Sequence, residues 1–436
     1  MASRLADLEA TVVAERTEPL DWRDKAVLPE WYGRTTTQVA ECAVPLDELS
    51  TPLLTLDRAA KDHNVAAMAD WCSARSVSLA PHGKTTLCPS LWRDQLRAGA
   101  WAITVANEPQ LQVARAAGVP RVVVANLFLR PDGLRWLAGE LHADPTFEFL
   151  CWVDSPEAVD IMNRALKSAG LDRPVPVLVE IGHPAARTGA RSLDDALAVA
   201  DAVASVPTLA LAGVAGYEGV VTHDVDPRAV AEVDDFLSRM AELHHRLLGR
   251  YEVPEVVLTA GGSAFFDRVA SVFAGSDGPS AGVKTRLVVR PGAYVVHDDG
   301  YYRTATPQRR GSGPALTPAL HVWSRVISMP EPGRAYLDAG KRDFPFDEGL
   351  PEAQLVRRRV ATGTHVVPLT DHEIVASNDQ HAHVQLPEDS PLRVGDVVRL
   401  GISHPCTAFD KWSLIPVLDD ASADVPVVVD LIRTYF

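Results

Sequence analysis

A lysine after a short apolar segment is the first residue of this chain that could do chemistry. Lys84 stands in Pro81-His82-Gly83-Lys84-Thr85, directly after the apolar run Val77–Ala80. A lysine just past a buried strand can lose hydration, which lowers the pKa of its amine and makes the free amine available for Schiff-base chemistry. The alternative is an ordinary surface lysine in a loop between strand and helix.

A glycine-rich segment, Gly261-Gly262-Ser263, follows another apolar run and precedes the helical segment Ala264–Phe273. Glycines let backbone N–H groups approach an anion, and the start of a helix adds a favourable dipole. The segment therefore suits a phosphate group, although a tight turn that needs a positive φ would have the same composition. Arg187 and Tyr217 could hydrogen-bond an anionic or phenolate ligand, or be a rim residue and a packed aromatic.

His404 and Cys406 are two residues apart, which places both side chains on one side of an extended segment, where they could bind a metal ion. A histidine and a cysteine at this spacing are by themselves a weak indication of a metal site, because a lone cysteine is commonly a core residue. His381 and His383 also share one face of a strand, and for His383 a solvated edge is the favoured interpretation.

The elements that must position these residues alternate regularly from Thr51 onward. Short β-branched apolar runs are separated by segments of helical period, such as Glu108–Ala117, Ser155–Ala169, Ser192–Ser205 and Pro227–Leu248. Eight strand–helix units predict a parallel sheet, and eight is the number that closes a (β/α)8 barrel; an open doubly wound sheet is the alternative, and Leu53–Leu56 could be a ninth strand. The eight predicted strands are Val77–Ala80, Trp101–Ala106, Arg121–Ala125, Phe147–Val153, Val175–Ile181, Leu209–Tyr217, Glu255–Ala260 and Thr285–Arg290.

The alternation stops after about Tyr294. Thr304–Pro318 is rich in proline, glycine and threonine and is typical of a linker or long loop. The later apolar runs are short, separated by turns and without helical period, which predicts a small β domain. These runs are His321–Ser328, Thr364–Pro368, His381–Leu386 and Val394–Leu400.

The composition excludes several classes of protein. The hydrophobic fraction of 47% is that of a globular chain with ample core, which rules out wholesale disorder. A formal net charge of −15 disfavours binding to nucleic acid or to anionic lipid, since like charges repel. We expect neither a secretion signal nor a membrane span. Five widely spaced cysteines do not form a disulfide framework, which indicates a reducing cytoplasm.

Taken together and in order, the polar motifs at the strand ends resemble those of one enzyme family. Pro81-His82-Gly83-Lys84-Thr85 is similar to the Pro-His-x-Lys-Thr segment of the fold-type III pyridoxal phosphate (PLP) enzymes, in the D-serine dehydratase and D-threonine aldolase branch of the alanine racemase-like superfamily. The resemblance covers about residues 50–415. It extends through Arg187-Thr188-Gly189, Tyr217-Glu218-Gly219, Gly261-Gly262-Ser263, Arg290-Pro291-Gly292-Ala293-Tyr294, Asp338-Ala339-Gly340-Lys341, Asp379-Gln380-His381 and Ser403-His404-Pro405-Cys406.

The resemblance implies an α/β fold, a PLP-binding (β/α)8 TIM barrel with a C-terminal mainly-β domain, and a homodimer. Residues 1–50 would be an N-terminal segment packed on the β domain, 51–300 the barrel, with Leu53–Leu56 outside it, and 301–436 the β domain with the metal ligands. Lys84 would be the Schiff-base lysine. The other cofactor-binding residues would be His82, Arg187, Tyr217, Gly261, Gly262, Ser263 and Tyr294, and the metal pair would be His404 and Cys406, with Asp379 and His381 as candidates for the metal shell or the substrate site.

The identity of residue 406 bears on the reaction. The aldolases of the family have an aspartate where Cys406 stands, and a thiolate suits Zn²⁺ whereas a carboxylate suits Mn²⁺ or Mg²⁺. The chain departs from the family where Thr86-Leu87 replaces His-Lys after Lys-Thr, and where Gln380 and Ala382 replace Glu and Gly of Asp-Glu-His-Gly. It thereby resembles proteins loosely labelled amino-acid deaminases, and the preferred substrate stays open.

We therefore expect a cytoplasmic lyase that uses PLP and a metal ion, zinc or another divalent ion, to eliminate water from a D-β-hydroxy amino acid similar to D-serine, giving a 2-oxo acid and ammonia. The nearest alternative is retro-aldol cleavage of the same substrates, as in D-threonine aldolase. A racemase would not need the His404/Cys406 pair. A non-catalytic PLP-binding protein that buffers the cofactor is the alternative from another class, and the β domain disfavours it.

Overall fold

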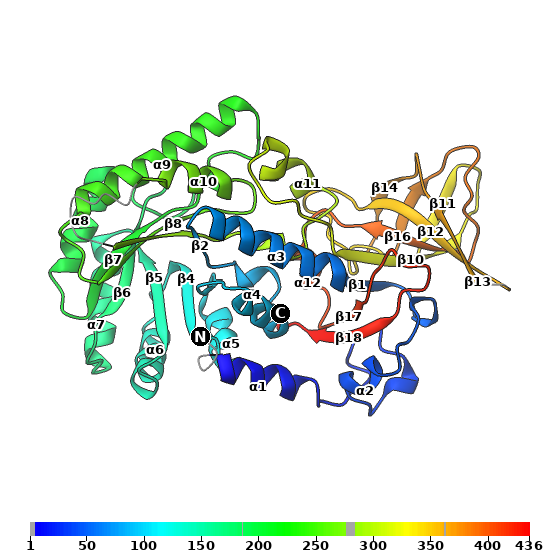
Figure 1. Ribbon diagram of the computed structural model, residues 1–436, viewed down its shortest axis with the longest axis horizontal. Coiled ribbons are helices and arrows are strands. Elements are labelled where there is room, and N and C mark those ends of the chain that lie inside the picture. The colour runs from blue at the N-terminus through cyan, green and yellow to red at the C-terminus, as the bar shows by residue number, and fades with distance from the viewer. Residues whose placement is uncertain (1–4, 185, 276–283, 362) are drawn as a thin grey trace.

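The chain forms a parallel barrel and a mainly antiparallel β domain (Figure 1). The computed structural model describes residues 5–184, 186–275, 284–361 and 363–436. Residues 1–4 of the predicted N-terminal segment, residues 185 and 276–283 of the predicted barrel and residue 362 of the predicted β domain lie outside the described residues. No helix in the described ranges is long and apolar enough to span a membrane.

The barrel is a sheet of eight parallel strands in the order β2-β9-β8-β7-β6-β5-β4-β3. Hydrogen bonds from the Trp101 amide to the Leu79 carbonyl (2.6 Å) and from the Thr104 amide to the Pro81 carbonyl (2.9 Å) join β2 to β3 and close it. All eight predicted strands are confirmed. They are β2 (Ser78–Leu79), β3 (Ile103–Val105), β4 (Arg121–Leu127), β5 (Glu148–Val153), β6 (Val175–Glu180), β7 (Leu209–Ala215), β8 (Glu255–Ala260) and β9 (Lys284–Val289).

The helices around the barrel begin at residues whose side chains cap them. Asn107 accepts a hydrogen bond from the Gln110 amide and Ser155 from the Ala158 amide, each followed within two residues by proline. Ser192 and Asp195 form a capping box at the start of α8. The helices are α3 (Arg58–Ala74), α4 (Pro89–Arg97), α5 (Glu108–Ala116), α6 (Pro131–Ala143), α7 (Pro156–Ser168), α8 (Leu193–Ala204), α9 (Pro227–Leu247) and α10 (Phe266–Phe273).

The interior of the barrel is filled with side chains. A buried cluster takes small or branched residues from the barrel strands or the residues beside them, with one large member, Trp152, on β5. Inward-facing residues of parallel strands pack in this way in TIM barrels, so ligands bind above the packed layers at the carboxyl ends of the strands. The cluster comprises Ala80, Ala102, Val123, Leu150, Trp152, Leu178, Ala215, Val257 and Val288.

The β domain is a ten-stranded sheet. One of its strands, β1, comes from the start of the segment predicted as the barrel. β1 (Leu53–Asp57) pairs with β10 and β17, so Leu53–Leu56 lies outside the barrel, as expected. The main path is β13-β12-β16-β10-β1-β17-β18, and β11, β14 and β15 branch from β10. The other strands are β10 (Leu320–Ser328), β11 (Arg334–Leu337), β12 (Glu352–Val360), β13 (Gly363–Pro368), β14 (Glu373–Ser377), β15 (Ala382–Gln385), β16 (Val397–Gly401), β17 (Leu414–Leu418) and β18 (Val428–Arg433).

The N-terminal segment contacts both parts of the molecule. Helix α1 (Ala6–Glu15) lies against the barrel, where Glu9 pairs with Arg97. Helix α2 (Thr36–Ala40) and the turns around it lie against the β domain, and the Leu46 amide donates to the Pro426 carbonyl. Short helical elements complete the chain: η2 (Pro29–Trp31), η3 (Leu46–Glu48), η4 (Gly83–Thr85), η5 (Glu218–Val220), η6 (Ala293–Val295), α11 (Tyr301–Ala305), η7 (Pro307–Arg310) and α12 (Cys406–Phe409).

Candidate active site

A cavity of about 380 Å³ opens at the carboxyl ends of the barrel strands, next to the β domain. Nine of the residues singled out in the sequence line it, although they come from both parts of the chain. Parallel strands and the β domain thus bring together segments that lie more than 300 positions apart. These residues are His82, Lys84, Arg187, Tyr217, Gly261, Gly262, Ser263, His404 and Cys406.

Lys84 lies on the η4 turn that leaves β2. This turn packs tightly: a Cβ built on Gly83 would lie 2.7 Å from Ile103 Cγ2 and 2.8 Å from Trp92 Nε1, so only glycine fits. The Lys84 side chain lines the cavity, and its amine forms neither a hydrogen bond nor an ion pair with any described residue. The turn therefore presents a free amine to the cavity.

His82 provides a neutral aromatic ring beside this amine. Burial lowers the pKa of His82 well below its usual range, and the positive charges of Lys84, Arg290 and Arg187 lower it further. Its Nδ1 atom is buried and has no hydrogen-bond partner among the described residues. An unpaired buried nitrogen costs free energy, which a bound polar ligand would recover.

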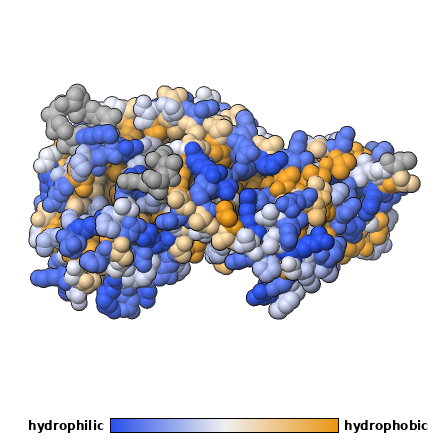
Figure 2. Space-filling view, turned by 60° about the horizontal axis from the view of Figure 1, so that its bottom comes forward, coloured by the Kyte–Doolittle hydropathy of each residue, from blue (hydrophilic) through white to orange (hydrophobic). Residues whose placement is uncertain are grey.

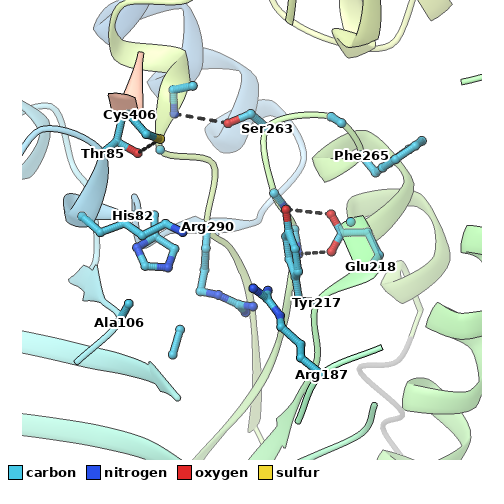
Figure 3. Close-up of a pocket in the computed structure, with 18 of the residues that line it drawn as sticks. His82, Thr85, Ala106, Arg187, Tyr217, Glu218, Ser263, Phe265, Arg290 and Cys406 are labelled. Atoms are coloured by element: carbon cyan, nitrogen blue, oxygen red, sulfur yellow. Dashed lines mark hydrogen bonds between the residues drawn. The ribbon is translucent and has the colours of Figure 1, made fainter. Parts of the chain in front are cut away.

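Two arginines form the positively charged side of the cavity (Figure 3). Arg290 is buried, its side chain donates to Thr259 Oγ1 and, at 2.7 Å, to the Gly216 carbonyl, and burial lowers its pKa to about 10. The guanidinium of Arg187 lies 4.6 Å from the centre of the Tyr217 ring, a cation–π distance. An anionic or phenolate ligand would find fixed positive charge on this side.

The glycine turn after β8 differs from its prediction. The amides of Gly261 and Gly262 donate to the carboxylate of Glu218, at 2.7 and 2.6 Å, and so are not free for a phosphate. Figure 3 shows both bonds beside the Tyr217 ring. The amides of the next residues, Ser263 and Ala264, have no acceptor in the described part of the chain, and both residues line the cavity. These amides at the start of α10 are the available anion-binding groups.

The predicted metal pair forms one contact group on the opposite side of the cavity. His404 and Cys406 hydrogen-bond to each other, and Cys406 Sγ also lies 3.3 Å from Thr85 Oγ1. The Nδ1 atom of His404 lies 2.7 Å from Asp347 Oδ2. Asp347 is held in turn by Thr407 Oγ1, at 2.6 Å.

His404 and Cys406 stabilise each other's charged forms. Burial disfavours the charged form of each group, but the thiolate and the Asp347 carboxylate together raise the pKa of His404 to about 9. Burial likewise opposes ionisation of Cys406, yet His404 and Thr85 hold the pKa of its thiol below the usual range. A thiolate beside an imidazole is a donor set that zinc favours.

Three predicted site residues lie elsewhere. Tyr294 is buried in the barrel wall, where its hydroxyl accepts a hydrogen bond from Gln95 Nε2 (3.1 Å), so it does not line the cavity as the resemblance implied. Asp379 and His381 are exposed in the turn between β14 and β15, and Asp379 pairs with Arg342. Neither lines the cavity, and their assignment to the metal shell or the substrate site stays a prediction.

Several cavity residues received no role from the sequence. Glu218 and Arg290 belong to the polar motifs at the strand ends. Their place directly after predicted strands could have identified them as cavity residues. Tyr301, Tyr302 and Glu348 come from segments without a motif, and only the meeting of the barrel with the β domain places them at the cavity.

The cavity fits PLP by its own chemistry. It offers an unpaired amine, a neutral aromatic ring with an unpaired buried nitrogen, two arginines and two free amides at a helix start, which match an aldehyde, a ring, a phenolate and a phosphate. For a metal the chain supplies two donors, and the described residues contain no group of three or more histidine, cysteine, aspartate or glutamate side chains that could hold one. Water or substrate would complete such a site.

The chain is similar in sequence to a serine dehydratase domain family and to aldolases named for D-β-hydroxy amino acids. The family described as putative serine dehydratase domain matches residues 319–418. A D-threonine aldolase of an Arthrobacter species is 30% identical over 388 residues, which are 87% of this chain and 92% of that protein. A 3-hydroxy-D-aspartate aldolase of Paracoccus denitrificans is 24% identical over 360 residues, 82% of this chain and 85% of that protein.

Solved structures share the fold over nearly the whole chain. D-threonine aldolase from Filomicrobium marinum superposes with a TM-score of 0.73 at 25% identity, over 90% of this chain and 97% of that one. D-threo-3-hydroxyaspartate dehydratase from Delftia sp. HT23 gives 0.67 at 21% identity, over 90% and 99%. Alanine racemase of Clostridium difficile 630 gives 0.58 at 12% identity, over 89% and 99%.

Proposed function

Because the chain belongs to the D-threonine aldolase family of alanine racemase-like, fold-type III PLP enzymes, we propose that it is a PLP- and metal-dependent lyase that removes water from D-β-hydroxy amino acids. Its relatives are named for D-threonine and for 3-hydroxy-D-aspartate, both β-hydroxylated D-amino acids. The observation that carries the proposal is the free amine of Lys84 in one cavity with the His404/Cys406 pair.

The barrel residues would hold the cofactor. Lys84 would bond to the cofactor's aldehyde, Arg187 would lie near its ring oxygen, Tyr217 would line its ring, and the Ser263 and Ala264 amides would bind its phosphate. When bound, PLP supplies an electron sink for the electrons of the substrate's Cα–H bond. Lys84 Nζ would be the base that removes the Cα proton.

The pair from the β domain would hold the metal. His404 Nε2 and Cys406 Sγ would be its protein ligands, and a bound Zn²⁺ would supply Lewis acidity toward the substrate's β-hydroxyl. Hydroxide is a poor leaving group without such help. The overall change is balanced: the β-hydroxy amino acid loses water, the resulting enamine hydrolyses with one water, and a 2-oxo acid and ammonium remain.

Elimination is favoured over aldol cleavage by Cys406. Two variants of the structurally similar D-threo-3-hydroxyaspartate dehydratase replace a histidine and a cysteine two positions apart, and the cysteine variant is described as metal-free. His404 and Cys406 have the same spacing. The relatives most similar in sequence are aldolases, however, so retro-aldol cleavage is the second candidate.

D-threonine distinguishes the two reactions. The PLP- and Zn²⁺-loaded protein is expected to form 2-oxobutyrate and ammonia in equal amounts from D-threonine, and neither from L-threonine. Equimolar acetaldehyde and glycine would establish the aldolase reaction instead. Lys84→Ala is the control, because it removes the proposed base; undiminished turnover by this variant would contradict the role of Lys84. PLP binding without turnover of any D-amino acid would identify a non-catalytic carrier.

We also propose that residues 51–300 serve cofactor binding and 301–436 carry the metal ligands, that the protein is a homodimer, and that it acts in the cytoplasm. Exposed apolar side chains on the β domain, namely Ile327, Val360, Val366 and Val394, support a covered face there. Figure 2 shows apolar surface gathered on this part of the molecule. The five cysteines are free, as expected in a reducing compartment.

A further inference from the structure

The charges at the cavity are divided between its two sides. Arg187 lies beside Tyr217, well separated in Figure 3 from Cys406 and Thr85. On the side of Cys406, the β domain contributes two carboxylates. Asp347 contacts the His404 ring, and Glu348, the next residue, lines the cavity itself.

The hydroxyl of Tyr301 is affected by carboxylate charges at this part of the cavity. Tyr301, which also lines the cavity, is half-buried, and burial raises the pKa of its hydroxyl. The negative charges of Glu348, Asp298 and Asp224 raise it further, in that order. Glu348 is therefore the carboxylate whose charge acts most strongly at this part of the cavity.

The proposed function places the substrate's side chain on this carboxylate side. The β-hydroxyl would be bound at His404 and Cys406, and the remaining substituent of Cβ is attached to the same carbon as that hydroxyl. It would therefore lie near His404, whose contact Asp347 is followed in the chain by Glu348, a residue that lines the cavity. Lys84 also lines the cavity, but its amine would bond to the cofactor or remove the Cα proton.

Two lysines lie near Phe346 without lining the cavity, so they do not offset the negative charge of Glu348 there. Lys341 and Lys411 lie 5.5 and 5.7 Å from the centre of the Phe346 ring, close in sequence to Glu348, but neither lines the cavity. His223 does line it, and its imidazole is a base that could meet a substrate carboxylate.

We propose that Glu348 is a specificity-determining residue that selects D-β-hydroxy amino acids with a neutral or positively charged substituent on Cβ and rejects those with a carboxylate there. The inference rests on the proposed function. It sets this chain apart from those relatives named for 3-hydroxy-aspartate, because a second substrate carboxylate would lie near Glu348, which lines the cavity, with Asp347 and Asp224 adding negative charge from outside it.

The test compares two substrates on the PLP- and Zn²⁺-loaded enzyme. Total carbonyl product, 2-oxo acid plus aldehyde, is measured from D-threonine and from D-threo-3-hydroxyaspartate, so the result does not depend on which bond is broken. We expect kcat/KM for D-threonine to be about tenfold higher, since several partly exposed like charges each contribute a few-fold. Glu348→Gln should reduce this ratio about threefold, and Glu348→Arg should reduce it further.

Glu331→Gln, an exposed glutamate in the turn between β10 and β11, is the matched control and should leave the ratio unchanged. A ratio that Glu348→Gln does not alter would overturn the inference while leaving the lyase function intact. A preference for 3-hydroxyaspartate that His223→Gln abolishes would also overturn it, because the imidazole would then bind the carboxylate. Absence of product from both substrates would instead contradict the proposed function.

Discussion

At the scale of single residues, the cavity depends on side chains that hold other side chains in place. Asp347 is the clearest case, since its carboxylate joins His404 Nδ1 to the Thr407 hydroxyl. Carboxylates in this position fix the tautomer and orientation of a metal-binding histidine and increase its basicity. Asp347 would thus act on a bound metal through His404.

Asp347→Asn should weaken Zn²⁺ binding about 10- to 100-fold while the barrel and its PLP site stay intact. The measurement is a competitive titration of Zn²⁺ against a chromophoric chelator, with PLP absorbance recorded in parallel. Asp389→Asn, on an exposed turn, is the control and should bind Zn²⁺ like the parent protein. Unchanged Zn²⁺ affinity in Asp347→Asn would show that Asp347 does not position the histidine.

Sequence reasoning reached some of these residues and not others for a physical reason. Lys84, Arg187 and Tyr217 follow strands, and parallel strands bring their carboxyl ends together whatever lies between them. Asp347 and Glu348 lie in an irregular loop whose position depends on the packing of the β domain. The local pattern of apolar and polar residues does not predict that packing.

At the scale of elements, the turns after the strands set the geometry of the cavity. The η4 turn carries Lys84 and is wedged between Ile103 of β3 and Trp92 of α4. A side chain at Gly83 would push this turn away from the barrel and move the lysine with it. The fit of this one residue therefore connects barrel packing to the position of the amine.

Gly83→Ala should lower the melting temperature and weaken PLP binding together, because a Cβ there would lie within 3 Å of two buried side chains. Gly139→Ala in α6 is the matched control: nothing lies within 4 Å of its Cβ, and alanine is favoured over glycine in a helix by up to about 1 kcal/mol. Thermal unfolding and PLP absorbance check both variants. A Gly83→Ala protein as stable and as PLP-competent as Gly139→Ala would contradict this account.

The glycine turn after β8 shows the limit of motif reading at this scale. Its glycines, placed after a strand and before a helix, predicted amides that bind phosphate. In the structure those two amides donate hydrogen bonds to the carboxylate of Glu218, which lies on the turn after the neighbouring strand β7. A strand–turn–helix pattern shows where free amides are available, but not which neighbouring side chain competes for them.

At the scale of the whole molecule, the cavity exists because two differently built parts meet. The regular alternation of apolar runs and helical segments was sufficient to predict a parallel sheet, and the family resemblance selected the closed barrel over an open sheet. The pairing of β1 with β10 and β17 was not predictable from any local pattern, because these partners lie more than 250 residues away in the sequence. The family resemblance, not periodicity, placed this strand correctly.

The junction between the two parts contains a buried carboxyl that makes stability depend on pH. Asp298 has no exposed surface; its Oδ1 accepts from the amides of Gly300 and Tyr302, at the start of α11. Its Oδ2 has no partner among the described residues. Burial raises the pKa of Asp298 from 3.8 to about 7. The folded chain thus holds a proton that the unfolded chain releases, and the free energy of unfolding falls as the pH rises from about 4 to about 7.

Asp298→Asn should remove this contribution, since an amide oxygen can still accept the Oδ1 hydrogen bonds but does not ionise. The variant is expected to be more stable than the parent at about pH 8, by at most about 4 kcal/mol for a shift of this size, and similar to it at about pH 4. Denaturant unfolding at both pH values measures the difference. An equal difference at both would show that ionisation of Asp298 is not its cause.

The most direct test of the whole account is pyruvate formation from D-serine by the PLP-loaded protein, followed with and without a strong chelator while the absorbance of the lysine-bound cofactor is recorded. Elimination at Lys84, assisted by a metal on His404 and Cys406, predicts pyruvate that disappears on chelation, returns with added Zn²⁺ and leaves the cofactor band unchanged. Undiminished pyruvate after exhaustive chelation, or none under any condition, would contradict it.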